Sequence, residues 1–140
     1  MFKKVKSIHF IGIGGIGMSG IAELLNNLGF KITGSDIKFS ENVKRLGLLG
    51  IEISIGHSPN NLKETDVVVY SSAVPLNNPE ILTAISKSIP IIKRAEMLGE
   101  LINLKRTSIA VGRTHGKTTT SSMIGMILEN CGYDPTLVVG

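Results

Sequence analysis

A glycine-rich turn between a predicted strand and a predicted helix restricts the fold of this chain more than any other feature. The turn matches the pattern G-x-G-x-x-G, and its glycines are Gly12, Gly14, Gly15 and Gly17. Residues 5–13 are mostly apolar and often β-branched, as in a strand that is buried on both faces. In residues 18–28, apolar side chains recur every three or four positions, which predicts an amphipathic helix. A buried strand that leads through a tight turn into a helix favours an α/β fold.

Strands and helices alternate along residues 1–105. Apolar and β-branched runs predict further strands at residues 30–32, 51–55, 66–70 and 91–93. Helical periodicity and helix-start residues predict further helices at residues 41–49, 80–88 and 95–104. Alternation at this spacing is typical of parallel strands joined by crossover helices. We therefore expect residues 1–105 to form one domain with a Rossmann-like, doubly wound parallel sheet.

Residues 106–140 predict the start of a second α/β domain. The segment contains a predicted strand at 107–111, then a phosphate loop, a helix at 117–130 and a strand at 136–139. So short a segment cannot build a hydrophobic core of its own. We therefore expect a truncated second domain, whose uncovered apolar helix face favours self-association or docking on the first domain.

Charge and composition argue against several functional classes. The 140 residues include 15 lysines and arginines and 11 aspartates and glutamates, and the basic residues are dispersed, so we expect no nucleic-acid partner. No apolar run approaches the ~20 residues of a membrane span, and no cleavable signal sequence is recognisable, so we expect a cytoplasmic protein. Because Cys131 is the only cysteine, an internal disulfide and a cysteine-rich metal site are excluded.

The glycine turn predicts a binding site for a diphosphate. Its glycines let the backbone approach phosphate groups at the positive N-terminus of the following helix. The alternative is a tight turn that binds no ligand. Asp36 comes at the end of the second predicted strand, where its carboxylate either accepts hydrogen bonds from ribose hydroxyls or caps a turn. These residues alone leave two ligands open, a nicotinamide dinucleotide in an NAD(P)-binding oxidoreductase domain and another nucleotide diphosphate.

A second phosphate loop is predicted at residues 112–120. Lys117 would reach the β and γ phosphates, Thr118 would offer a hydroxyl to Mg²⁺, and amides around Gly116 would face the phosphates. The strict P-loop pattern fails, because its first glycine would fall at Val111. The alternative is a lysine that caps a helix among unrelated threonines.

Other polar residues follow strands at the edge where open α/β sheets bind ligands. His57 follows the third strand, Ser72 comes after the valine-rich strand, and Arg94 follows the last strand of the first domain. Each either contacts a ligand or is an ordinary loop residue. His9 lies within the first strand, so we expect a core or sheet-edge histidine with its hydrogen bonds satisfied.

In combination, several segments of the chain resemble the Mur ligase family. They are residues 8–19, 34–36, 71–74, 93–98 and 114–120. The resemblance implies an ATP-dependent amide ligase of peptidoglycan precursor synthesis with three domains, which bind a UDP-sugar, ATP and an amino acid. It further implies that the substrates are UDP-N-acetylmuramate and L-alanine, and that the substrate carboxylate becomes an acyl phosphate, which the amine attacks. The 140 residues alone are then expected to be inactive.

The resemblance also divides the candidate site residues into two sets. The UDP-sugar set is Gly12, Gly14, Gly15, Ile16, Gly17, Ser35, Asp36, His57, Ser72 and Arg94. The ATP set is Arg113, Thr114, His115, Gly116, Lys117, Thr118 and Thr119. Within it Lys117 would be catalytic and Thr118 a ligand of Mg²⁺. Arg113 stands where the family usually has glycine, which is costly if the position needs a positive φ but otherwise adds a contact to an anion.

Overall fold

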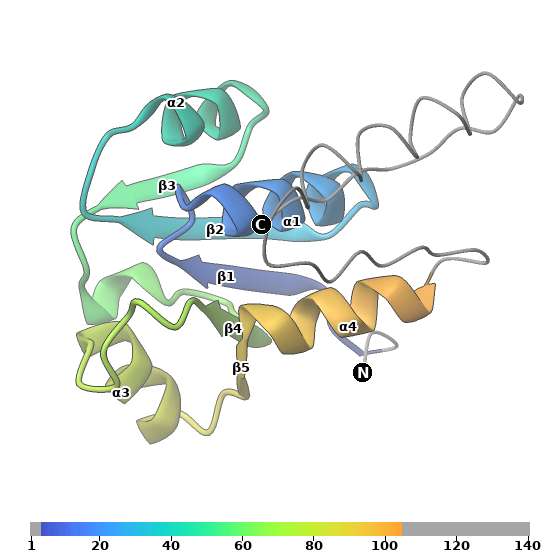
Figure 1. Ribbon diagram of the computed structural model, residues 1–140. Helices are drawn as coiled ribbons and strands as arrows, with labels where there is room; N and C mark the ends of the chain where they lie inside the picture. The colour runs from blue at the N-terminus through green and yellow to red at the C-terminus, as the bar shows by residue number, and fades with distance from the viewer. Residues whose placement is uncertain (1–3, 105–140) are drawn as a thin grey trace, which may run out of the picture.

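Five parallel strands form one sheet in residues 4–104, the part of the chain that this computed structural model describes. The strands are β1 (Ser7–Ile11), β2 (Lys31–Asp36), β3 (Glu52–Ile55), β4 (Val67–Tyr70) and β5 (Ile91–Lys93). They lie in the order β3-β2-β1-β4-β5, and every neighbouring pair is parallel (Figure 1). The chain therefore starts at the centre of the sheet and builds outward in both directions, which confirms the predicted doubly wound α/β fold.

Helices cover both faces of the sheet. They are α1 (Ile16–Asn27), α2 (Glu41–Leu48), α3 (Pro79–Ser86), α4 (Arg94–Leu104) and the short 3-10 helix η1 (Pro59–Asn61). Buried side chains of α1, α2 and α4 form one hydrophobic core, and those of α3 join Leu62 after η1 in a second core. Right-handed crossovers explain this division, because the chain moves across the sheet in opposite directions before and after its return to β4.

β1 is buried on both faces, and its side chains alternate between the two cores. Ile8 and Phe10 pack in the core beneath α1, whereas Ile11 packs in the core beneath α3. His9 shares the α3 face with Ile11, since side chains two positions apart in a strand point the same way. The central strand thus carries a histidine into the interior, where it is 1% exposed.

The predicted element boundaries differ from the structure mainly around the glycine turn. β1 is shorter than the predicted strand because the backbone turns at Gly12, whose φ is +80°. β2 is longer and runs through polar residues to Asp36, because Ser35 pairs with Ile11 of the central strand. In addition, Gly34 makes room for Ile13 on β2. Pairing with β1 therefore outweighs the weak strand signal of residues 33–36.

The predicted second domain lies outside the part of the chain that the structure describes. The predicted strand, phosphate loop and helix of residues 106–140 lie outside the described residues, so the division of the chain at residue 105 stays a prediction. Within residues 4–104, no helix is both long and apolar enough to cross a membrane.

Asp66 ties the loop before β4 to the start of β1. Its Oδ2 accepts hydrogen bonds from the backbone N–H groups of Lys6 at 2.8 Å and Ser7 at 3.0 Å. These hydrogen bonds hold the pKa of the Asp66 carboxyl below its ordinary value, and the one from Lys6 has the largest effect. The loop that returns the chain to the second half of the sheet is thereby anchored to the central strand.

Replacement of Gly34 by alanine tests the packing of Ile13 on β2. A Cβ at position 34 would lie 2.5 Å from Cδ1 and 2.8 Å from Cβ of Ile13, so one of the two segments must shift. We expect Gly34→Ala to lower the free energy of unfolding by about 1–3 kcal/mol, as overpacking usually does. Gly20→Ala is the matched control, because a Cβ there meets no atom within 4 Å. It should raise stability by about 0.5–1 kcal/mol. Equal urea midpoints for the two variants would contradict this.

Replacement of Asp66 by asparagine tests the anchor of the β4 loop. Because the folded-state pKa is lowered, the carboxylate contributes stability above its unfolded pKa and loses it as the pH falls through the lowered value. We expect Asp66→Asn to be less stable than the wild type at neutral pH, with a gap that narrows below about pH 4. Urea denaturation across this pH range measures the gap. A gap that does not change with pH would show that the charge of Asp66 contributes nothing.

Candidate functional site

The glycine turn is fastened to the carboxyl end of β2. The N–H groups of Gly12 and Ile13 both donate to the carbonyl oxygen of Ser35, at 2.8 and 3.0 Å, and Gly15 N–H donates to the carbonyl of Gly12 at 3.2 Å. The positive φ of Gly12 would strain any residue with a side chain. These contacts fix the path of the backbone between β1 and α1, as a site that binds phosphate through backbone amides requires.

The N-terminus of α1 is open. Gly15 is its N-cap residue, and no side chain accepts a hydrogen bond from the first-turn amides. The first turn also lacks an acidic residue that would offset the positive end of the helix dipole. Ile16 at the start of the helix is 76% exposed. Unpaired N–H groups at an accessible helix N-terminus form a site for an anion.

Arg94 lies against this helix end. A Cβ built on Gly17 would be 2.5 Å from Nη1 of Arg94 and 3.1 Å from its Cδ and Cζ, so the guanidinium occupies the space that glycine leaves. Within residues 4–104, Arg94 forms no ion pair. The structure thus brings together a positive side chain and a positive helix end that are 77 positions apart in sequence (94 − 17). An anion placed between them would relieve their mutual repulsion.

Asp36 holds the glycine turn from the side of β2. Its Oδ2 accepts the N–H of Gly14 at 2.8 Å, and its Oδ1 accepts the N–H of Lys38 at 3.2 Å. The amide of Asn42 in α2 donates to the carbonyl of Gly14 at 3.0 Å. Both backbone groups of Gly14 are therefore held by side chains, and Asp36 caps the turn as one of its two sequence interpretations expects. Its contact with a ribose stays a prediction.

A buried carboxylate lies beneath the carboxyl ends of β1 and β2. Glu80, in the first turn of α3, is 0% exposed, and its Oε1 is 2.6 Å from Nε2 of His9. Its Oε2 accepts the hydroxyl of Ser35 at 2.7 Å and lies 2.6 Å from Nδ1 of His57. His9 is also bonded through Nδ1 to Thr33 at 2.8 Å. This confirms the prediction that His9 is a core histidine whose hydrogen bonds are satisfied.

Three side chains around Glu80 decide its ionisation. Burial alone raises the pKa of the Glu80 carboxyl, but its interactions with His9, Ser35 and His57 outweigh burial, so the pKa lies below its ordinary value. Glu80 was not predicted from the sequence, because an acidic residue after Asn78 and Pro79 is typical of an ordinary helix start. No local signal shows that this acid is buried or that it faces two histidines.

Some of the remaining predicted residues lie near the glycine turn, and the others lie outside the described residues. Ser71 approaches the turn, since a Cβ built on Gly12 would lie 3.8 Å from its Oγ, whereas Ser72 is exposed. The predicted ATP and Mg²⁺ residues, Arg113 to Thr119, lie outside the described part of the chain. Within that part, no three His, Cys, Asp or Glu side chains are grouped so that they could hold a metal ion.

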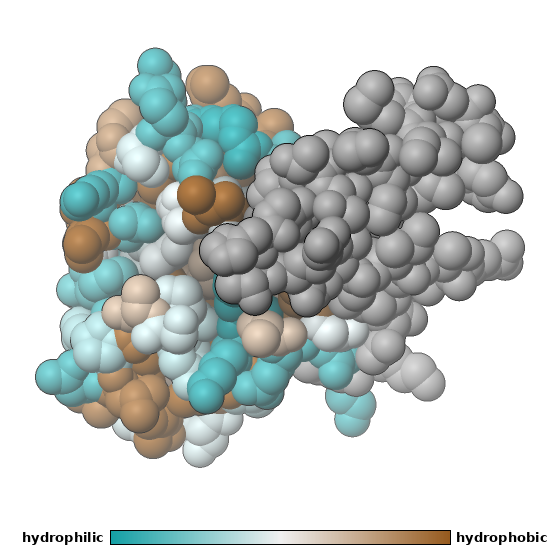
Figure 2. Space-filling model, viewed as in Figure 1, coloured by the Kyte–Doolittle hydropathy of each residue, from teal (hydrophilic) through white to brown (hydrophobic). Residues whose placement is uncertain are grey.

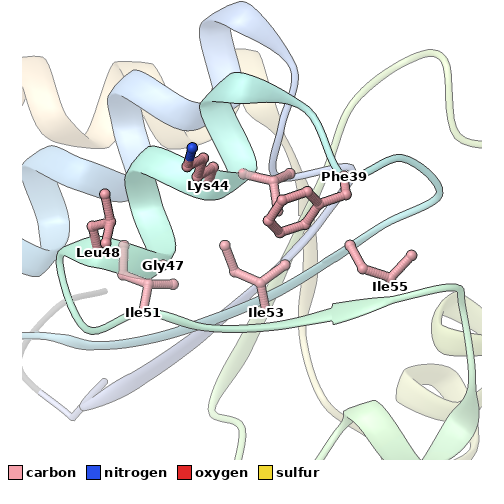
Figure 3. A pocket seen from close by; sticks show the side chains of 8 residues that line it. Phe39, Lys44, Gly47, Leu48, Ile51, Ile53 and Ile55 are labelled. Carbon is pink, nitrogen blue, oxygen red and sulfur yellow. The ribbon is translucent and has the colours of Figure 1, made fainter.

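A separate depression of about 300 Å³ lies between α2 and the edge strand β3 (Figure 3). Its lining is apolar apart from Lys44, and includes Phe39, Leu48, Ile53 and Ile55. Lys44 is the only charged side chain in this lining, so the depression is poorly suited to a diphosphate. Figure 2 shows that hydrophobic residues on the visible face are interspersed with hydrophilic ones. The polar groups described above make the glycine turn the better candidate site.

Comparisons with known proteins match most of this chain. The model of the Mur ligase family, catalytic domain, matches residues 7–106. A UDP-N-acetylmuramate--L-alanine ligase from Solidesulfovibrio magneticus is 56% identical over 140 residues, which are 100% of this chain and 30% of the relative. This chain thus spans about 30% of the length of the curated relatives it matches.

Two solved structures share both the fold and much of the sequence. The UDP-N-acetylmuramate-alanine ligase from Thermotoga maritima has a TM-score of 0.85 and 37% identity, and the match covers 90% of this chain and 30% of that one. A UDP-N-acetylmuramate:L-alanyl-gamma-D-glutamyl-meso-diaminopimelate ligase from Neisseria meningitides has a TM-score of 0.83 and 33% identity, and the match covers 91% and 40% of the two chains. The family match, the sequence identity and the shared fold together show that this chain belongs to the Mur ligase family.

Proposed function

We propose that this chain is the UDP-sugar-binding part of an ATP-dependent ligase that joins L-alanine to UDP-N-acetylmuramate. The observation that carries the proposal is the pairing of an open helix N-terminus with the guanidinium of Arg94 at the glycine turn. Both groups attract the negative charge of a diphosphate, and backbone amides can approach it closely because the turn is built of glycines. The rest of the substrate, beyond the diphosphate, is proposed from the names of the relatives.

Residues beside the diphosphate would bind the nucleoside and the sugar. His57 and Ser71 lie at the carboxyl edge of the sheet with the glycine turn, and ligands of open α/β sheets bind at this edge. The side chain of His57 is 18% exposed, so part of its ring is accessible to a ligand. Ser72, which is exposed beside Ser71, stays a candidate for the same surface.

A nicotinamide dinucleotide is a less well supported ligand. Asp36 does not favour it, because the carboxylate could accept a ribose hydroxyl from a dinucleotide and from a UDP-sugar in the same way. The prediction of an oxidoreductase also leaves the motif of residues 114–120 without a role.

The proposal includes ATP and Mg²⁺ because residues 112–120 predict a second phosphate loop. Lys117 has the charge to bind transferring phosphate oxygens, and the hydroxyl of Thr118 is the kind of oxygen ligand that Mg²⁺ accepts. The metal ion would offset negative charge on the transferring group. We expect binding without ligation from the 140 residues alone, because the curated relatives are more than three times as long. Self-association through residues 106–140 and a cytoplasmic location stay predictions.

Calorimetric titration of the 140-residue chain with UDP-N-acetylmuramate tests the proposal directly. We expect saturable binding with one ligand per chain, and weaker binding of UDP, which keeps the diphosphate but lacks the sugar. Titration of the chain into NADH, followed by nicotinamide fluorescence, should show no enhancement. No saturable heat with the UDP-sugar, from a chain whose cooperative unfolding shows that it is folded, would reject the proposal.

Gly17→Ala tests the role of Arg94 without a change to Arg94 itself. The new Cβ would meet the far end of a flexible side chain, so the guanidinium must leave the helix end while the fold is retained. Loss of one charged hydrogen bond of about 1.5–3 kcal/mol corresponds to a roughly tenfold to hundredfold weaker affinity for UDP-N-acetylmuramate.

The matched control for this variant is Gly20→Ala in the same helix, where the added methyl meets no atom within 4 Å. Gly20→Ala should bind as the wild type does. If Gly17→Ala bound equally well, Arg94 would have no part in diphosphate binding.

A further inference from the structure

We propose that Glu80 is a positioning residue that fixes the ring of His57 in its Nδ1–H tautomer, so that Nε2 faces outward and accepts a hydrogen bond from the ligand. The inference rests on the proposed UDP-sugar site, because it takes His57 to be one of its contacts. It gives a role to a buried carboxylate that neither the sequence motifs nor the glycine turn explains. Two contacts at Nδ1 of His57 and the accessibility of its Nε2 carry the inference.

The inner side of the His57 ring is set by Glu80 and Ser35. Nδ1 of His57 lies 2.6 Å from Oε2 of Glu80 and 3.0 Å from Oγ of Ser35. An ionised carboxylate has no proton to donate, so Nδ1 must carry the hydrogen. Ser35 donates its own hydroxyl hydrogen to Glu80 at 2.7 Å, and its oxygen therefore also faces Nδ1 as an acceptor. Both neighbours demand the same tautomer.

The outer side of the His57 ring reaches solvent. Within residues 4–104, no buried side-chain nitrogen or oxygen lacks a hydrogen-bond partner, and Nε2 of His57 makes no hydrogen bond there. Nε2 is therefore an accessible atom of a side chain that is 18% exposed. In the Nδ1–H tautomer this nitrogen carries a lone pair. It can accept a hydrogen bond from an N–H or O–H group of the ligand, such as the imide of a pyrimidine or a sugar hydroxyl.

The same carboxylate fixes His9 in the opposite tautomer. Oε1 of Glu80 lies 2.6 Å from Nε2 of His9, so Nε2 carries the hydrogen, and Nδ1 accepts the hydroxyl of Thr33 at 2.8 Å. His9 is 1% exposed and has no free nitrogen to offer a ligand. One buried carboxylate thus holds two histidines in different tautomers, and only His57 presents its remaining nitrogen outward.

The glycine turn and His57 are joined through the same residues. The carbonyl of Ser35 accepts the N–H groups of Gly12 and Ile13, while its hydroxyl donates to Glu80. In addition, the carbonyl of Asp36 accepts the N–H of Gly56, which precedes His57, at 2.8 Å. The position of Nε2 relative to the diphosphate site is therefore fixed by β2 as well as by Glu80.

Nitrogen-15 spectra of the histidine rings in the ligand-free chain test the tautomer first. At about pH 8, well above the ordinary histidine pKa of about 6.5, the chemical shifts distinguish protonated from unprotonated ring nitrogens. We expect His57, assigned by the signals lost in His57→Gln, to be the Nδ1–H form. A solvated histidine favours the Nε2–H form. Finding that form for His57 in the wild-type chain would overturn the inference without any variant.

Two substitutions of Glu80 then separate positioning from a structural role. Glu80→Leu removes the acceptor, so His57 should lose its single tautomer, and UDP-N-acetylmuramate should bind about tenfold more weakly. Glu80→Gln should restore both, because the amide oxygen can accept from Ser35 and His57 while the amide nitrogen donates to His9. His9 should then change to its Nδ1–H form, a signature that a merely structural role does not predict.

The outcomes are distinct. A folded Glu80→Leu chain with the wild-type tautomer of His57 or the wild-type affinity would overturn the inference. A tautomer and an affinity that Glu80→Gln fails to restore would also overturn it, because the amide oxygen can make the same two contacts. If His57 is in the Nδ1–H form in the wild-type chain but the chain binds no UDP-sugar, the proposed function is rejected. The positioning of His57 by Glu80 is then still supported.

Discussion

The rest of this structure depends on the hydrogen bonds of Ser35, which connect the glycine turn to the buried carboxylate of Glu80. Its carbonyl accepts two N–H groups of the glycine turn, and its hydroxyl donates to Glu80 beneath the sheet. Its backbone also pairs with Ile11 at the end of β1. One residue at the end of β2 therefore sets the turn that leads into α1 and the buried network under the same edge. Loss of either connection would leave the candidate site without a fixed frame.

Charge is arranged so that positive groups face outward and the carboxylates are satisfied inside. The open end of α1 and the guanidinium of Arg94 lie together at the turn. Asp36 and Glu80, the acids nearest to them in the network, are held by hydrogen bonds from Gly14, Lys38, Ser35 and the two histidines. A diphosphate bound there, as we propose, would meet donors and positive charge, while the nearby carboxylates already accept hydrogen bonds.

Much of the fold was predictable because its signals are local. The glycines at 12–17, the buried run before them and the amphipathic helix after them each follow from a short stretch of sequence. The polar end of β2 was harder, because its strand conformation comes from pairing with β1 rather than from its own residues. Among the site residues, Arg94 and His57 were found only as alternatives, since a strand end places many polar side chains that bind nothing.

By itself, the sequence determined the order of strands and helices and the glycine turn between β1 and α1. Only the tertiary structure decided which distant groups meet. Glu80 is 71 positions from His9 and 45 from Ser35, and parallel strand order with a crossover between them brings the three together. A carboxylate in the first turn of a helix is usually a surface group, so its burial cannot be read from its neighbours in sequence. The physical reason is that desolvation of an acid is tolerable only where donors from other strands replace water.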